Sequence, residues 1–450
     1  MGIKIFAVTM KTYRTFASVI FFALCFPLFA QNSYIFPLQL WPGNRFLVDQ
    51  EGTPFFWSGD AAWSLIVQLS REDADLYLDD RKAKGFNVLM VNLIEHRFCT
   101  NAPNNYYNEP PFTGQLFTTP NENYFNHADY VIESAAKRGI IILLFPLYLG
   151  YDCGIDGWCE DARAATNEDL RFYGQYLGKR YRNFTNIIWC AGGDTDPSQV
   201  RDRMLACING IYEKCPDHLF SSHNQPGSFA LSPWHGEQWM TINNLYSYST
   251  TLYDQCRTAY EQEPVMPYFM IESAYENEHQ ASAQRLRSQA YWPILCGAMG
   301  HIFGNCPIWH FGGFPSWCDK SDWKAELDQP GSVSMDLLQR LFLSRPWHLL
   351  VPDFDHKVLL SGYGTWGKED YATAARASDG STIIAYLPSA RPVTIDLTKI
   401  TGSKAICRWY DPRTGVFTET GIYETNGTRE FLPPSEEDWV IVLDKINQDQ

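Results

Sequence analysis

The sequence lacks several patterns that would point to common enzyme and binding classes. It has no CxxC pair or other paired zinc-ligand spacing, which argues against a structural metal site. It has no GxSxG motif, so the usual nucleophile elbow of serine hydrolases is missing, and no glycine-rich phosphate fingerprint. After residue 30, no apolar run is long enough to span a membrane. We therefore expect neither a metal nor another cofactor.

Basic residues are scarce once the N-terminus is set aside. Residues 1–30 are predicted to be a signal peptide, because Lys11 and Arg14 precede the apolar run FASVIFFALCFPLFA and Ala30 offers a small residue for cleavage. Without this segment the 36 Lys and Arg fall to 33 against 51 acidic residues, a net charge of −18. This balance argues against nucleic acid as a partner but tolerates an anionic sugar where Arg or Lys is concentrated. We expect a periplasmic or secreted protein with no membrane segment after signal removal, and its oligomeric state stays open.

Aromatic residues and cysteines are plentiful. The 15 Trp and 25 Tyr either fill a large core or line a cleft that binds sugars, since such rings are flat and amphipathic. Beyond residue 30 there are eleven cysteines, an odd number for an exported protein. Cys153 with Cys159, and Cys207 with Cys215, could each form a disulfide. Cys190, inside an apolar strand, is expected to be a buried packing residue.

Apolar strands alternate with helical patterns from about residue 53 to 345. The expected strands are PFFWSGD (54–60), FNVLMVNLIE (86–95), IIILLFPLYLG (140–150), NIIWCAGGD (186–194), LFSSH (219–223), WMTINNLYSYS (239–249), PYFMIE (267–272) and HIFGNCPIW (301–309). Eight such repeats predict an α/β fold, a (β/α)8 TIM barrel over residues 31–352. A doubly wound open sheet is the rival, which the missing phosphate fingerprint disfavours.

The C-terminal part of the sequence changes pattern. Residues 353–450 alternate apolar and polar positions between turns such as SDGS, which predicts a small antiparallel β-sandwich domain. It carries no evident catalytic grouping. Packing support for the barrel is the favoured role, and glycan or surface binding is the alternative.

In eight-stranded barrels the active site lies at the C-terminal ends of the strands. The polar residues found there are Asp60, Asn92, Glu95, Asp194, His223 and Glu272. Asp194 and Glu272 stand out, because cleavage of a glycosidic bond needs one carboxyl group to protonate the departing oxygen and another to attack carbon or activate water. Asp196 and Glu276 are the alternatives if the strand registers shift by two.

Other residues on the same rim are expected to contact substrate. Asn92, His223, Tyr275 and Trp309 could bind hydroxyls or stack on a sugar face, although a lone His at a strand end is more often structural. The long loop over residues 99–123 could restrict the cleft and favour removal of a terminal sugar.

Four stretches, GDAAWSL, RKAKGFNVLMV, IIWCAGGDTDP and PYFMIESAYE, resemble the apiosidase-like barrels of glycoside hydrolase family 140, which carry an appended collagen-binding-like domain. The resemblance runs in the correct order across nearly the whole mature chain. It implies removal of apiose from side chains of the pectin rhamnogalacturonan II. It also implies that Asp194 is the general acid/base and Glu272 the nucleophile.

The resemblance places Asp60 and Trp63 in substrate binding or in scaffolding of the site, with Ala61 where the family usually has Thr. Thr241 and Tyr246 replace an Asp and a Gln of the family pattern, which bears on the identity of the sugar. The leading interpretation is a glycoside hydrolase that retains configuration, with its carboxyl groups about 5–5.5 Å apart. The alternative is a non-catalytic adhesin whose degenerate barrel binds carbohydrate or matrix.

Overall fold

The structure, a computed structural model, describes Gly2 and residues 34–314 and 318–446. Apart from Gly2, the predicted signal peptide lies outside the described residues. Within the described part of the chain, no helix has the length and apolar character needed to cross a membrane.

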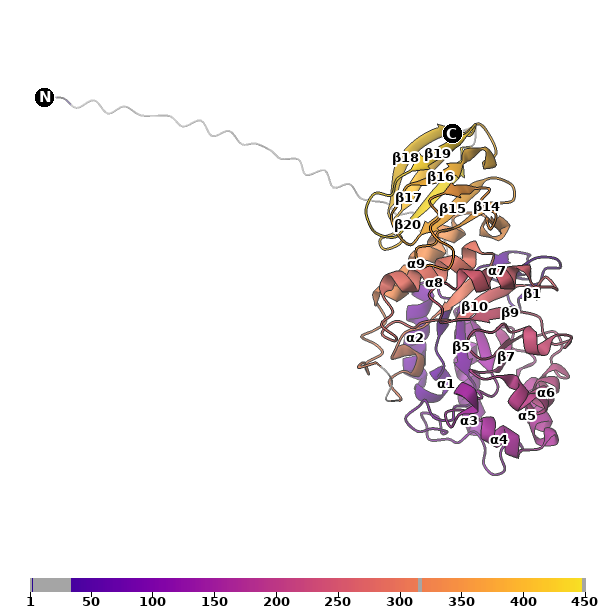
Figure 1. Cartoon of the computed structure of the whole chain (residues 1–450). Helices are drawn as coiled ribbons and strands as arrows, with labels where there is room; N and C mark the ends of the chain where they lie inside the picture. Colours follow the sequence, from indigo (N-terminus) through magenta and orange to yellow (C-terminus); the bar gives the residue numbers. More distant parts are fainter. Residues whose placement is uncertain (1, 3–33, 315–317, 447–450) are drawn as a thin grey trace. The chain divides into compact units, whose positions relative to one another are not determined.

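Eight parallel strands form the predicted barrel (Figure 1). In chain order they are β4 (Trp57–Ala61), β5 (Val88–Asn92), β6 (Ile141–Phe145), β7 (Ile187–Gly192), β8 (Leu219–His223), β9 (Asn243–Tyr246), β10 (Tyr268–Glu272) and β11 (Gly300–Phe303). Their order in the sheet is β8-β7-β6-β5-β4-β11-β10-β9. The N–H groups of Thr241 and Ile242 donate to the carbonyl of Phe220, so hydrogen bonds also join the two ends of the sheet and close it.

The observed strands are shorter than the apolar runs in the sequence. The last run was expected to continue to residue 309, but β11 ends at Phe303 and residues Ile308–His310 form the short 3-10 helix η4. The N-terminal residues 39–55 hold a separate antiparallel ribbon made of β1 (Gln39–Leu40), β2 (Leu47–Val48) and β3 (Pro54–Phe55).

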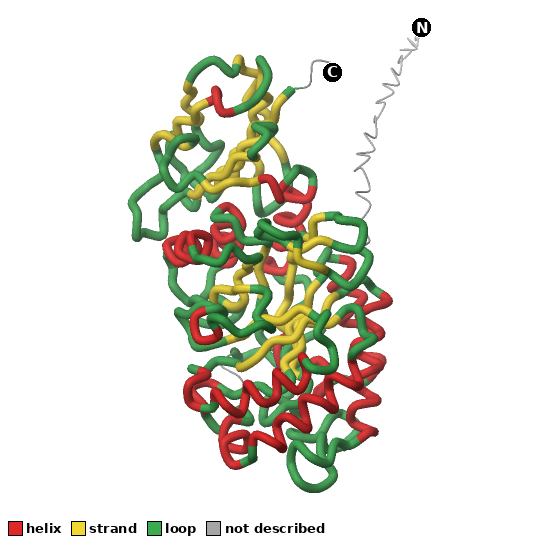
Figure 2. The backbone as a smooth tube through the Cα atoms, turned by 90° about the vertical axis from the view of Figure 1, so that its right-hand side faces the viewer, coloured by secondary structure: helices red, strands yellow, loops and turns green. Residues whose placement is uncertain are grey.

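Helices surround the barrel, as the red segments around the yellow strands show (Figure 2). They are α1 (Leu65–Gln68), α2 (Arg71–Ala83), α3 (Glu122–Lys137), α4 (Cys159–Ala164), α5 (Asn167–Tyr181), α6 (Arg201–Tyr212), α7 (Tyr253–Glu261), α8 (Ala283–Leu295) and α9 (Pro330–Leu343). The expected cap of α2 is present, since the Ser70 hydroxyl accepts the Asp73 N–H at 3.1 Å.

The strands are buried on both faces, which explains their continuous apolar character. Along β6, Ile141, Leu143 and Phe145 pack into one cluster, and Ile142 and Leu144 pack into another that contains helix residues. The Phe145 ring lies 5.8 Å from the His223 ring, so the side chains on this face of β6 point into the barrel interior.

The C-terminal region forms the predicted antiparallel sandwich. Its six-stranded sheet has the order β12-β14-β15-β20-β17-β18, and its three-stranded sheet has the order β13-β16-β19. The strands are β12 (Leu350–Pro352), β13 (Leu359–Ser361), β14 (Thr373–Ala377), β15 (Thr382–Leu387), β16 (Val393–Asp396), β17 (Lys404–Tyr410), β18 (Phe417–Glu424), β19 (Thr428–Phe431) and β20 (Trp439–Lys445). Because β12 pairs with β14, the sheet begins at residue 350, ahead of the expected boundary at 353.

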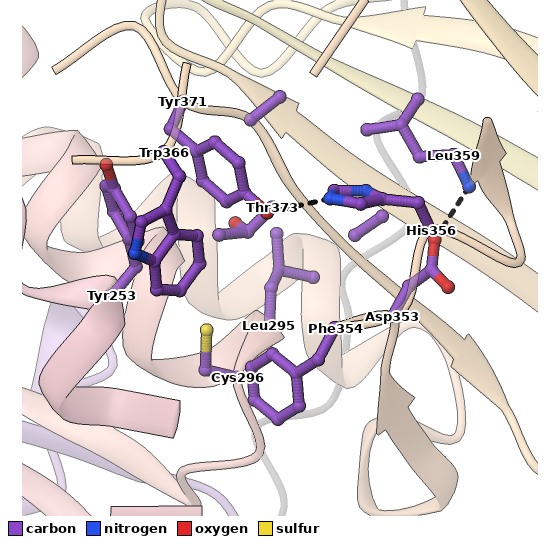
Figure 3. A pocket seen from close by; sticks show the side chains of 12 residues that line it. Tyr253, Leu295, Cys296, Asp353, Phe354, His356, Leu359, Trp366, Tyr371 and Thr373 are labelled. Atoms are coloured by element: carbon purple, nitrogen blue, oxygen red, sulfur yellow. Dashed lines mark hydrogen bonds between the residues drawn. The ribbon is translucent and has the colours of Figure 1, made fainter. Parts of the chain in front are cut away.

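The sandwich packs against α8 of the barrel. The Arg287 guanidinium donates two 2.7 Å hydrogen bonds to the Asp438 carboxylate, and the rings of Tyr291 and Tyr386 stack with centroids 4.6 Å apart. Figure 3 shows another part of this contact, where Tyr253 meets residues of the sandwich and a gap of only about 10 Å³ remains. That gap is the size of one water molecule, so these surfaces fit closely.

Two disulfides are present in the described part of the chain. The expected Cys153–Cys159 bond is confirmed, and the sequence analysis missed Cys306–Cys318. The suggested bond between Cys207 and Cys215 is wrong, since both are buried free thiols and Cys215 donates to the Ile211 carbonyl. Cys190 is fully buried, as expected.

Candidate active site

A cavity of about 710 Å³ opens at the C-terminal ends of the barrel strands. Of the eight predicted site residues, those that line it are Trp63, Asn92, Asp194, Glu272, Tyr275 and Trp309. His223 and Asp60 do not. These six residues lie at or after the C-terminal ends of five strands, β4, β5, β7, β10 and β11.

The turn after β7 explains the two glycines that precede Asp194. Gly193 has a φ of +128°, and a Cβ atom there would lie 2.3 Å from Cδ2 of Tyr148. The missing side chain lets the Tyr148 ring approach, and its hydroxyl donates a 2.7 Å hydrogen bond to Oδ2 of Asp194. Asp194 itself has a φ of +55°. Its N–H donates to Nδ1 of His223 at 3.1 Å and its carbonyl accepts the Asp152 N–H at 3.1 Å, so the turn is held from both sides.

Glu272 ends β10 and is only 5% exposed. Its Oε1 accepts hydrogen bonds from the hydroxyls of Tyr248 at 2.9 Å and Tyr246 at 3.4 Å, and its Oε2 lies 2.9 Å from Nε2 of His223. Because Nδ1 of His223 accepts the Asp194 N–H, the proton of the neutral ring lies on Nε2 and is donated to Glu272.

His223 is fully buried and does not line the cavity. The expected contact of this residue with substrate is therefore wrong. Its ring instead joins the backbone of Asp194 to the side chain of Glu272, which makes it a positioning residue.

The two carboxyl groups are close enough to influence each other. One side-chain ligand atom from each of Asp194, His223 and Glu272 lies within 4.8 Å of the other two. Burial raises the pKa of Glu272, the negative charge of Asp194 raises it further, and hydrogen bonds from His223 and Tyr248 partly offset both effects. Burial favours the neutral ring of His223, but the hydrogen bond to Glu272 and the charge of Asp194 outweigh it and raise the pKa of His223. The charge of Asp194 therefore favours the protonated forms of both Glu272 and His223.

The same three residues are the group in the described ranges whose ligand atoms could approach a metal ion. Both ring nitrogens of His223 are already engaged, one by the Asp194 N–H and the other by Glu272. His223 would have to give up one of these hydrogen bonds to bind a cation. The hydrogen bonds among Asp194, His223 and Glu272 therefore fit a pair of carboxyl groups that act in proton transfer better than they fit a metal site.

Aromatic and amide side chains form the rest of the wall. The Trp63 indole donates to the Tyr275 hydroxyl at 3.0 Å, and the Trp309 indole donates to Oε1 of Glu278 at 2.9 Å. Asn92 donates to Glu95, which lies behind the wall and does not line the cavity.

Tyr148, Tyr248 and Glu278 are among the lining residues that the sequence analysis missed. Tyr148 and Tyr248 each follow an apolar strand, so the rule that active-site residues lie at the C-terminal ends of the strands could have identified them. Glu278 lies six positions beyond the end of β10, too far along its loop for that rule. It is 6% exposed, and burial together with the charge of Glu272 raises its pKa to about 7 despite the hydrogen bond from Trp309.

Asp60 lies outside the cavity and is fully buried. Its Oδ2 accepts hydrogen bonds from the Tyr77 hydroxyl and from Nε of Arg81, both at 2.6 Å. Its inclusion among the substrate contacts is therefore wrong, since the carboxylate is the buried counter-ion of Arg81. This position fits the scaffolding role that the sequence analysis also considered.

The alternative carboxylates serve other purposes. Asp196 is exposed and caps the 3-10 helix η2 (Pro197–Gln199). Glu276 accepts hydrogen bonds from Asn305 and from the N–H of Gly331. Neither lines the cavity, so the strand registers are not shifted.

The loop over 99–123 does not restrict the cavity, contrary to the expectation from its length. The last lining residue before it is Phe98, and its own Phe112 and Phe117 pack against Tyr173 of α5. The segments that follow β6 and β10 contribute Tyr151 and Glu278 instead.

Comparison with protein families gives two matches. Residues 42–348 match the model described as "Apiosidase-like, catalytic domain", and residues 354–444 match "Putative collagen-binding domain of a collagenase". A search of curated protein sequences finds no match to the chain.

Solved structures share the fold across both regions. One described as a glycoside hydrolase is 24% identical with a TM-score of 0.83, and the match covers 93% of this chain and 100% of that one. A glycoside hydrolase family 5 structure from Bacteroides vulgatus is also 24% identical, with a TM-score of 0.82 and coverage of 93% and 97%. At this identity the likeness concerns the fold.

Proposed function

The chain belongs to the apiosidase-like family of glycoside hydrolases, and from this premise we propose that it removes terminal apiose from plant pectin such as the side chains of rhamnogalacturonan II. The predicted signal peptide supports action in the periplasm or outside the cell, where such a polymer is met.

The spacing of Asp194 and Glu272 carries the proposal. A side-chain oxygen of one lies within 4.8 Å of an oxygen of the other, inside a cavity at the mouth of the barrel. Retaining glycosidases hold their carboxyl groups about 5–5.5 Å apart, whereas inverting enzymes need about 6.5–9.5 Å to admit a water. The observed spacing supports retention.

In the proposed first step, an oxygen of Glu272 attacks the anomeric carbon while the bond to the leaving oxygen breaks and Asp194 gives that oxygen a proton. In the second step, Asp194 takes a proton from water, and the water oxygen displaces Glu272 and releases the sugar. Hydrogen bonds from His223 and Tyr248 support the first step, because they stabilise Glu272 as a carboxylate.

The surroundings of Asp194 suit a general acid. Its Oδ1 is buried, and no described residue donates a hydrogen bond to it. A general acid needs an oxygen from which it can give a proton, and Oδ1 is the carboxyl oxygen of Asp194 that no hydrogen bond from the described residues occupies.

The test is to incubate the purified protein with rhamnogalacturonan II fragments and to measure released apiose, arabinose, rhamnose and galactose. We expect apiose, and NMR of the fresh product should show the anomeric configuration of the substrate. Release of another sugar contradicts the apiose assignment, and an inverted product contradicts retention. Binding to the fragments without release of any sugar would favour the adhesin alternative.

A further inference from the structure

Two residues on loops that border the cavity, Tyr151 and Glu278, have no role in the chemistry described so far. One loop follows β6 and carries Tyr151, and the other follows β10 and carries Glu278. In the sheet order, β6 and β10 are separated by four of eight positions, so the two loops face each other across the mouth of the barrel.

The loop after β6 presents an aromatic ring beside Asp194. The side chain of Tyr151 is 63% exposed although it lines the cavity. The Cys153–Cys159 disulfide closes the loop, and the Asp152 N–H donates to the Asp194 carbonyl at 3.1 Å. An exposed ring held at a cavity edge offers an apolar face on which a sugar ring can stack.

The loop after β10 presents a buried acceptor on the side of Glu272. The Glu278 carboxylate is 6% exposed, lines the cavity, and accepts one hydrogen bond from the Trp309 indole. The indole ring of Trp309 lines the cavity as well. A carboxylate has more acceptor sites than this one bond uses, and sugar hydroxyls are suitable donors for the rest.

The chemistry then fixes the direction of the substrate. In a retaining glycosidase, the nucleophile contacts the sugar that is released, and the acid/base contacts the oxygen of the leaving group. We propose that the released sugar binds against Glu278 and Trp309, and that Tyr151 forms a subsite on which the leaving-group sugar stacks. This inference rests on the proposed function, since it uses the roles of Asp194 and Glu272.

Two substrates distinguish the subsite of the released sugar from the subsite of the leaving-group sugar. Apiosyl fluoride offers the released sugar with no leaving-group sugar, and an apiose-bearing rhamnogalacturonan II fragment offers both. Tyr151→Ala should lower the ratio of kcat/KM on the fragment to kcat/KM on the fluoride by about tenfold, the scale of one lost aromatic contact. Tyr151→Phe should keep the wild-type ratio, because stacking uses the ring face. Glu278→Gln keeps an acceptor for Trp309 and should lower kcat/KM on both substrates by a similar factor.

Phe172→Ala is the matched control, since Phe172 is an exposed aromatic residue of α5 that does not line the cavity. If the wild-type enzyme is active and Tyr151→Ala keeps its ratio of kcat/KM on the fragment to kcat/KM on the fluoride, the leaving-group subsite is overturned while the proposed function stands. A loss in Glu278→Gln on the fragment alone overturns the assigned direction. A wild-type enzyme inactive on both substrates overturns the proposed function, and the inference falls with it.

Discussion

Replacing Asp60 by Asn tests whether this residue supports the fold or contacts substrate. Asp60 and Arg81 have side chains that are both 0% exposed and joined by a 2.6 Å contact. Removing one partner of such a buried pair costs about 3–5 kcal/mol, because the other charge is left unpaired. We expect the lower end, about 3 kcal/mol, because Asp80 also contacts the Arg81 guanidinium at 2.9 Å.

Urea unfolding measures this loss, and with an m-value of about 3 kcal/mol/M the midpoint should fall by about 1 M. The double variant Asp60→Asn/Arg81→Met removes the unpaired charge and should recover a large part of the lost stability. The KM of folded Asp60→Asn should stay near the wild-type value. A stability change under about 1 kcal/mol together with a KM raised about tenfold would refute this reasoning and return Asp60 to the substrate contacts.

Four further results are expected. Asp194→Asn and Glu272→Gln should each lower kcat about 10²–10⁴-fold or more in the apiose-release assay, with melting temperatures near wild type. The raised pKa of Glu272 places the acid limb of kcat/KM above the ordinary glutamate value of 4.5, and His223→Ala should move that limb to still higher pH because it removes a donor to the carboxylate. Cys153→Ser should lower stability by about 2 kcal/mol or less, since the disulfide closes a short loop, and should lower kcat/KM on the fragment more than on apiosyl fluoride. Asp438→Asn leaves Arg287 without its buried counter-ion and should cost about 3 kcal/mol in urea unfolding.

The barrel was predictable because each strand is buried on both faces and so reads as a continuous apolar run. LFSSH was placed at 219–223, where β8 lies, and the other strands were found with ends shifted by a few residues. A strand ends where its hydrogen bonds to the neighbouring strand stop, as β11 does at Phe303. The amino-acid composition of the segment does not show where this happens.

The proposed catalytic pair could be predicted from the rule that strand ends meet at one face of the barrel, but the contacts that surround the pair could not. Asp60 and Asp194 both end strands, yet one points into a buried ion pair with Arg81 and the other into the cavity. Asp60 lies within β4, where Tyr77 and Arg81 of α2 bind its carboxylate, whereas Asp194 lies in the turn after β7, where Tyr148 binds it. Glu278 was missed for the related reason that its position is set by its loop and by Trp309, both beyond the strand pattern.

The sandwich contacts the helix that follows Glu272, the proposed nucleophile. The helix α8 comes after β10, which ends at Glu272, and it carries both Arg287 and Tyr291 to the sandwich. A helix tied at its outer face by a buried ion pair and a ring stack restricts the strand that it covers. Because Glu272 must stay within a few tenths of an ångström of its place opposite Asp194, this restraint bears on turnover as well as on stability. We therefore expect the packing of the C-terminal domain to influence turnover, although none of its described residues lines the cavity.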